Sequence, residues 1–310
     1  MPPKEVEKFS DPKITAKGDQ RAWVELKALE TLWLNSGTLC NIQCENCYIE
    51  SSPKNDRLVY LTLAEAREYL DEIEREGLQT HEIGITGGEP FMNPDMIPMM
   101  ELILQRGFKL LLLTNAMKPM HHKKQEMLDL LERFGDQMII RVSVDHFTQE
   151  LHQDERGVGT WEPMIQGLQW LASQGFTIDI AGRTRWGEDE AELRNGFSGL
   201  FKELGVKVDA HNPKELMLFP EMDEKTEVPE ITTACWDILD VHPDSMMCAT
   251  SRMVVKRKGA AKPTVLACTL LPYEEEFEMG QSLKEASEAI YLNHPHCAKF
   301  CVLGGGSCSA

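Results

Sequence analysis

The chain has 310 residues, of which 32 are Lys or Arg and 50 are Asp or Glu, so its formal net charge at pH 7 is −18. A surface this acidic repels nucleic-acid phosphates and anionic lipid headgroups, which argues against nucleic acids and membranes as partners. A chain of 310 residues is long enough for one large or two ordinary domains. Its hydrophobic residues, 42% of the chain, are sufficient for a packed core. No run approaches the ~20 apolar residues of a membrane-spanning helix, and the start lacks an apolar signal segment, so we expect a soluble cytoplasmic protein.

Strand and helix signals alternate along residues 31–219. The first helix has a clear start, because Thr62 and Glu65 have the spacing of a capping box, and Gly77 suits its end. Strand-length apolar runs fall at residues 31–34, 82–86, 109–114, 138–144, 176–181 and 215–219, and helical patterns at 62–77, 93–105, 123–134, 161–174 and 191–204. About six such units predict an α/β fold, either a partial (β/α)6 TIM-like barrel or a doubly wound sheet.

The chain changes character near residue 220. Residues 1–22 are polar and charged, as expected of an N-terminal arm, and an acidic, proline-punctuated segment follows residue 220. Further on, residues 253–268 contain two short apolar runs around a glycine, which predicts a β-hairpin. We therefore expect an arm over 1–22, a barrel over 23–220 and a small cysteine-rich domain over 221–310.

The nine cysteines are unevenly placed. Disulfides are rare in the cytoplasm, so clustered cysteines there indicate metal or redox chemistry. Three of them lie together, and the other six fall in the last 76 residues: Cys40, Cys44 and Cys47, then Cys235, Cys248, Cys268, Cys297, Cys301 and Cys308.

The first group has the spacing C-x3-C-x2-C, directly after the first expected strand. Three thiolates suit an iron–sulfur cluster, whose irons take four ligands in all, so that one iron stays open to a substrate. A structural zinc is less suitable, because it needs four protein ligands and no further Cys or His lies nearby. Unliganded thiols this close together would be prone to oxidation.

This motif resembles the signature of the radical S-adenosylmethionine (radical SAM) enzymes. The resemblance implies a [4Fe–4S] cluster held by Cys40, Cys44 and Cys47, with SAM chelated to the fourth iron. It also implies a reducing donor such as a flavodoxin or ferredoxin, whose electron cleaves SAM into methionine and a 5′-deoxyadenosyl radical that removes hydrogen from substrate. The residue before the third cysteine is usually aromatic in this family but is Asn46 here, and Tyr48 is the aromatic candidate for the adenine.

Further family motifs follow the expected strands. Gly87-Gly88-Glu89-Pro90 ends the second strand, and taken alone it favours an ordinary turn. In the resembled family, the matching segment binds the methionine ammonium of SAM. Polar residues end the next three strands, where α/β folds place ligands. The resemblance makes them candidates for SAM binding, with turns, helix caps and surface ion pairs as the alternatives: Asn115, Ser143, Asp145, Arg183 and Arg185.

The late cysteines resemble the SPASM/twitch extensions of radical SAM maturases. Cys248 and Cys268 bracket the expected hairpin, and Cys297 and Cys301 follow it. The resemblance implies a second, auxiliary [4Fe–4S] cluster bound by these four, with Cys308 able to replace one of them. A structural zinc is the alternative, since tetrathiolate zinc sites have equally variable spacing. Cys235 fits a buried thiol as well as a ligand.

These motifs together predict a radical SAM oxidoreductase of the maturase type. We expect it to abstract hydrogen from a peptide or small-molecule substrate, with the auxiliary cluster transferring an electron. Two alternatives stay open from the sequence. One is a radical SAM barrel with a structural zinc in the C-terminal domain, and the other is a non-catalytic iron–sulfur electron carrier.

Overall fold

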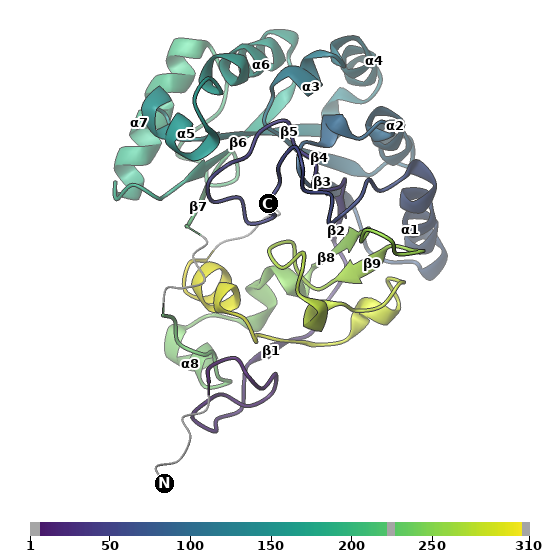
Figure 1. Ribbon diagram of the computed structural model, residues 1–310, viewed down its shortest axis with the longest axis vertical. Coiled ribbons are helices and arrows are strands. Elements are labelled where there is room, and N and C mark those ends of the chain that lie inside the picture. The colour runs from purple at the N-terminus through teal and green to yellow at the C-terminus, as the bar shows by residue number, and fades with distance from the viewer. Residues whose placement is uncertain (1–6, 222–226, 306–310) are drawn as a thin grey trace.

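The computed structural model describes residues 7–221 and 227–305. Its main feature is an eight-stranded sheet with the strand order β7-β6-β5-β4-β3-β2-β8-β9 (Figure 1). Strands β2 to β7 run parallel, each beside its neighbour in the sequence, which confirms the predicted partial barrel. These six strands are β2 (Thr31–Asn35), β3 (Glu82–Thr86), β4 (Lys109–Thr114), β5 (Met138–Asp145), β6 (Thr177–Arg183) and β7 (Leu216–Phe219).

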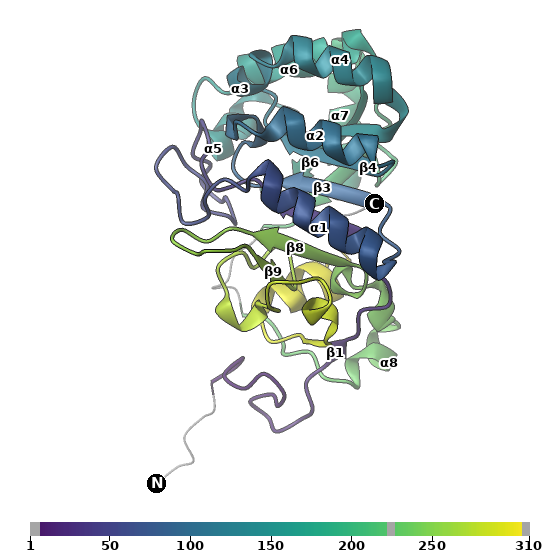
Figure 2. The same cartoon turned by 90° about the vertical axis from the view of Figure 1, so that its right-hand side faces the viewer.

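Helices cover the outer side of this curved sheet, as Figures 1 and 2 show. They are α1 (Leu63–Glu76), α2 (Met96–Gln105), α3 (Lys118–His121), α4 (Lys124–Phe134), α5 (Gln149–Arg156), α6 (Trp161–Gln174) and α7 (Glu190–Leu204). The sequence predicted all of them except the short α3 and α5. The capping box of α1 is present, with both reciprocal bonds between Thr62 and Glu65, and Gly77 ends the helix with a φ of 62°.

Helix α2 begins later than the proline pattern predicts, at Met96. The preceding residues form a 3₁₀ turn over Pro90–Met92 instead. Asn93 then holds the chain in place, because its side-chain amide donates to the carbonyl oxygens of Ser36 (3.2 Å) and Leu61 (2.9 Å). These bonds connect the start of α2 to the loops after β2 and before α1.

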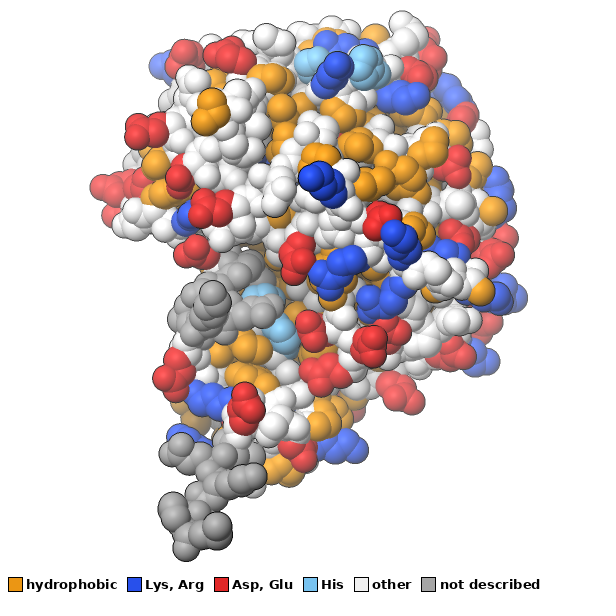
Figure 3. Space-filling view, in the orientation of Figure 1, with side chains coloured by type: hydrophobic (Ala, Val, Ile, Leu, Met, Phe, Trp, Pro, Cys, Tyr) orange, Lys and Arg blue, Asp and Glu red, His pale blue; other side chains and the backbone are white. Residues whose placement is uncertain are grey.

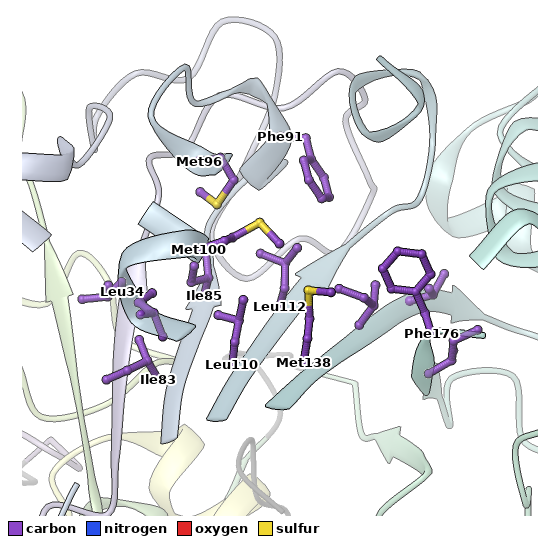
Figure 4. Packing of buried hydrophobic residues seen from close by; sticks show 14 of the residues in the cluster. Leu34, Ile83, Ile85, Phe91, Met96, Met100, Leu110, Leu112, Met138 and Phe176 are labelled. Atoms are coloured by element: carbon purple, nitrogen blue, oxygen red, sulfur yellow. The ribbon is translucent and has the colours of Figure 1, made fainter. Parts of the chain in front are cut away.

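The main core lies between the sheet and the helices. Aliphatic side chains of β2 to β5 meet methionines of α2 and Phe91 in Figure 4. The labelled strand residues are almost fully buried, and each such side chain stabilises the fold by roughly 1.5–3 kcal/mol. Strands such as β2 and β3 are buried on both faces and therefore have continuous apolar runs in the sequence, which is why they could be located from it.

The predicted hairpin is present but extends the barrel sheet. Strand β8 (Ser251–Val255) pairs in parallel with β2, and β9 (Thr264–Leu266) pairs antiparallel with β8. The C-terminal segment therefore shares the sheet of the barrel, which the sequence did not indicate. It also contains the short helix α8 (Cys235–Leu239) and a π-helix over Cys297–Val302.

The N-terminal residues pack on this C-terminal segment. Strand β1 (Trp23–Val24), assigned to the barrel from the sequence, pairs instead with β10 (Ile290–Tyr291). Arg21 is fully buried and forms an ion pair with Glu230 at 2.6 Å. Part of the expected loose arm is thus fixed by a buried charge pair.

Two observations concern the exterior. In the described part of the chain, no helix combines the length and apolar character needed to cross a bilayer. Acidic and basic side chains are interspersed over the described atoms of the face in Figure 3, and no continuous basic patch is visible there.

Candidate active site

A cavity opens at the carboxyl ends of the parallel strands. The last residue of each strand from β3 to β7 lines it, namely Thr86, Thr114, Asp145, Arg183 and Phe219. The space free of protein atoms, open mouth included, is about 1140 Å³. Most of the residues singled out from the sequence meet here: Cys40, Cys44, Cys47, Tyr48, Gly87, Gly88, Asn115, Ser143, Asp145 and Arg183. Glu89, Pro90 and Arg185 do not line the cavity.

Gly87 and Gly88 allow the cysteine loop to approach the end of β3. The Gly88 amide donates to the Gly37 carbonyl at 2.7 Å. A β-carbon at Gly88 would overlap the carbonyl oxygen of Leu39, and one at Gly87, whose φ is 141°, would lie 2.6 Å from that of Gly37. Only glycine fits both positions without moving the loop backbone.

Glu89 links two strands in this structure. Its buried carboxylate accepts hydrogen bonds from the Thr114 hydroxyl (2.8 Å) and from the amides of Asn115 (2.9 Å) and Phe91 (3.2 Å). Burial raises the pKa of Glu89 to about 7 although these donors act to lower it. The carboxylate expected to face the SAM ammonium therefore connects the ends of β3 and β4.

Asn115 contacts the cysteine loop directly. Its side-chain amide donates to the Asn41 side-chain oxygen at 2.9 Å and lies 3.8 Å from the Cys40 sulfur. Its own side-chain oxygen accepts from the Met117 amide at 3.0 Å. The end of β4 thus sets the position of the first cysteine.

Asp145 lies between two arginines. Arg156 binds it with Nε at 2.6 Å and a second nitrogen at 3.2 Å, and Nε of Arg183 lies 3.4 Å away. Burial alone would raise the pKa of Asp145, but these two positive charges outweigh it and lower the pKa. Arg156 also lines the cavity. Arg156 was not predicted from the sequence, where its one available signal is a basic residue just before Gly157, at the end of a helix without apolar periodicity.

Glu155, the residue before Arg156, fixes the other end of the cysteine loop. Its carboxylate accepts from the Asn46 backbone (3.0 Å) and side chain (3.2 Å), and from Arg185 at 2.7 Å. Its carbonyl oxygen accepts from the Glu45 amide at 2.8 Å. Asn46, at the position that is aromatic in the resembled family, therefore has a structural partner, while Tyr48 lines the cavity.

Two thiols of the cysteine loop do not ionise at neutral pH without a bound metal, as their pKa values show. Burial raises the pKa of Cys40 to about 12 and that of Cys44 to about 11, the latter partly offset by Arg156. The thiolate forms therefore depend on the charge of a bound metal. Within residues 7–221 and 227–305, no three His, Cys, Asp or Glu side chains are placed to hold a single metal ion. Cys40, Cys44 and Cys47 share one wall of the cavity.

A second, smaller cavity lies in the C-terminal segment. Its wall contains four cysteines of the predicted auxiliary site together with His296, namely Cys248, Cys268, Cys297 and Cys301. Cys235 lies outside it, and its sulfur accepts from the Thr232 amide at 3.4 Å. Cys308 lies outside the described residues.

The two cavities share part of their walls. Leu270 lines both. The π-helix contributes Phe300 to the first cavity and Cys297 and Cys301 to the second. The walls of the two cavities therefore adjoin at Leu270 and at the π-helix.

We compared the chain with known proteins. The family model of the radical SAM superfamily matches residues 34–190. The chain is 28% identical to the subtilosin biosynthesis protein AlbA of Bacillus subtilis over 143 residues, 46% of this chain and 30% of AlbA. It is 27% identical to the mycofactocin maturase MftC of Mycobacterium tuberculosis over 137 residues, 44% of this chain and 33% of MftC. These matches span about a third of each relative.

Solved structures show the same fold. Streptococcus suis SuiB bound to the precursor peptide SuiA aligns with a TM-score of 0.60 at 12% identity, covering 85% of this chain and 66% of SuiB. The enzyme anSMEcpe with bound AdoMet aligns with a TM-score of 0.59 at 13% identity, covering 87% and 82%. Both alignments extend beyond the residues of the barrel. The matched model, which covers half of the sequence, and the cysteine loop at the mouth of the barrel establish that this chain belongs to the radical SAM superfamily.

Proposed function

We propose that this chain is a maturase-type radical SAM enzyme that abstracts hydrogen from a peptide and uses a second iron–sulfur cluster for electron transfer. The observation that carries the proposal is the shared cavity. Three cysteines of one loop and the polar ends of the parallel strands face the same space. This is the edge at which α/β barrels bind ligands.

Cys40, Cys44 and Cys47 would hold a [4Fe–4S] cluster, which supplies the electron that cleaves SAM into methionine and a 5′-deoxyadenosyl radical. Around it, Gly87 and Gly88 keep the loop against β3, and Asn115 orients it from β4. Both contacts are independent of the ligand, so the loop is already positioned before SAM binds.

The opposite wall would bind the nucleoside and the amino acid part of SAM. Ser143 and Asp145 offer a hydroxyl and a carboxylate to the ribose hydroxyls, and Tyr48 offers a ring for the adenine. Arg183 and Arg156 supply positive charge for the SAM carboxylate. Both arginines line the cavity, whereas Arg185 does not, and it pairs with Glu155 and Glu45 at 2.7 Å and 3.2 Å. We therefore assign the carboxylate to the first two arginines.

The C-terminal cysteines would bind the auxiliary cluster. Cys248, Cys268, Cys297 and Cys301 line one cavity, and Leu270 separates it from the first. That shared wall supports electron transfer from an oxidised substrate radical to the auxiliary site. A zinc ion at the same cysteines is the competing assignment, and the position of His296 in the cavity wall favours it, because zinc accepts mixed Cys and His ligands.

A peptide is favoured over a small metabolite as substrate. The relatives include a bacteriocin biosynthesis protein and a maturase, and a structure with the same fold has a precursor peptide bound. Phe219, Pro220 and Phe300 give the cavity an apolar side suited to side chains of a peptide. A flavodoxin or ferredoxin is the proposed electron donor.

Anaerobic incubation with SAM and dithionite tests the reaction. We expect the iron-reconstituted protein to release 5′-deoxyadenosine, and Cys44→Ala to release none. Cys235→Ala is the matched control, because its thiol lines neither described cavity, and it should retain the activity. A reconstituted protein with a full iron complement but no 5′-deoxyadenosine would contradict the proposal. Metal analysis of the same samples separates iron from zinc at the C-terminal site.

A further inference from the structure

Arg252 carries a buried positive charge in strand β8. The residue is 1% exposed. Its guanidinium donates to four backbone carbonyl oxygens, those of Cys248 (2.6 Å), Ser251 (2.7 Å), Ala286 (2.8 Å) and Glu288 (3.4 Å). Carbonyl dipoles satisfy its hydrogen bonds, but they carry no net negative charge. Burying an unpaired charge costs several kcal/mol, so a structure that keeps one needs a reason.

The other fully buried arginines differ in this respect. Arg21 pairs with Glu230 at 2.6 Å, and Arg141 pairs with Asp179 at 3.3 Å. Among the described residues, no carboxylate lies within ion-pair distance of Arg252. Of these three arginines, Arg252 alone has no carboxylate partner among the described residues.

Arg252 contacts a residue of the second cavity, whose thiols can become anionic. Arg252 bonds the backbone of Cys248, and the charges that bear on its pKa are those of Cys248 and Cys268. A guanidinium is not deprotonated in proteins, so Arg252 carries its positive charge here. Both cysteines line the cavity that also contains Cys297 and Cys301.

We propose that Arg252 is the counter-charge of the C-terminal metal site. The inference rests on the proposed function in that it requires a metal–thiolate centre there. Four thiolates around a [4Fe–4S] core or a zinc ion leave more than one negative charge, of which the fixed guanidinium compensates one in a water-poor environment. In an iron–sulfur cluster, a nearby positive charge also stabilises the reduced form and raises the reduction potential.

The test uses the full-length chain with Cys40, Cys44 and Cys47 all changed to Ala, so that only the C-terminal cluster gives a signal after reconstitution with iron and sulfide. Arg252→Met removes the charge and keeps much of the side-chain length, and Arg252→Lys keeps the charge. Arg141→Gln is the control for loss of a buried guanidinium elsewhere. Iron per chain and the midpoint potential from an EPR-monitored titration are the readouts.

We expect the midpoint to become more negative in Arg252→Met, to stay near that of the parent in Arg252→Lys, and to be unchanged in Arg141→Gln. Failure of the methionine variant alone to retain iron also supports the charge requirement. An unchanged midpoint in Arg252→Met overturns the inference, as does loss of iron from both Arg252 variants while Arg141→Gln retains it.

If the parent chain holds zinc, the readout becomes the rate of zinc release to a chelator. Release should be faster from Arg252→Met than from Arg252→Lys, and equal rates overturn the inference. A parent chain that holds neither metal at these cysteines overturns the auxiliary centre of the proposed function together with this inference. A normal cluster with an unchanged potential in Arg252→Met overturns the role of Arg252 alone.

Discussion

At the scale of single residues, the site depends on close backbone contacts as much as on reactive groups. The two glycines after β3 and the carboxylate of Glu89 all hold neighbouring loops, through Gly37, Leu39 and Asn115. A motif identified by its resemblance to a ligand-binding segment thus also has a structural role that the sequence does not reveal. The contact partners lie about 50 residues earlier or 26 residues later in the chain, beyond the reach of local patterns.

The substitution Gly88→Ala tests this contact. A β-carbon would overlap the Leu39 carbonyl, and neither backbone can yield without moving the cysteine loop. We expect a loss of roughly 1–3 kcal/mol in the free energy of unfolding and reduced iron content after reconstitution. Gly199→Ala is the control, because a β-carbon there meets no atom within 4 Å and the helix gains about 0.5–1 kcal/mol. Equal iron contents in the two variants would show that Gly88 is not needed to position the cysteine loop.

At the scale of elements, burial pattern decides what the sequence could predict. The parallel strands and most helices have apolar runs or apolar faces, and they were located within a few residues. Helix α5 was missed because its buried residues are His152 and Glu155, so no hydrophobic periodicity exists. Arg156 was missed with it. The parallel pairing of β8 with β2 could not be predicted either, because the pairing of strands that are distant in the sequence leaves no local sequence pattern.

Helix α5 should therefore be needed for the cysteine loop through its polar face. Glu155→Gln removes the charge that pairs with Arg185 and one acceptor of the Asn46 bonds. We expect a loss of about 1.5–3 kcal/mol in the free energy of unfolding, because a buried carboxylate loses its charge-assisted hydrogen bonds, and weaker SAM binding by calorimetry. Glu150→Gln, an exposed position in the first turn of the same helix, should change neither. An unaltered SAM affinity in Glu155→Gln would show that the cysteine loop does not depend on the Glu155 carboxylate of α5 for its position.

At the scale of the whole molecule, the barrel and the C-terminal segment share one sheet. Strand β8 continues the barrel beyond β2, and β1 near the N-terminus pairs with β10 near the C-terminal cysteines. The second cavity is consequently built on the same framework as the first and shares Leu270 with it. An electron path between the two sites would have a fixed length, since β8 is paired with β2 in one sheet.

A shared sheet predicts a single unfolding transition. Val254 in β8 and Leu168 in α6 are both fully buried in the same core cluster, although they belong to different segments of the chain. Val254→Ala and Leu168→Ala should each lower the free energy of unfolding, by roughly 1–5 kcal/mol, and shift one calorimetric transition of the whole molecule. If the C-terminal segment were an independent domain, the scan would resolve two transitions, and each substitution would move only one of them. Two transitions would show that the two cavities belong to separate folding units. The spacing between them would then not be fixed, and the proposed electron transfer depends on a fixed spacing.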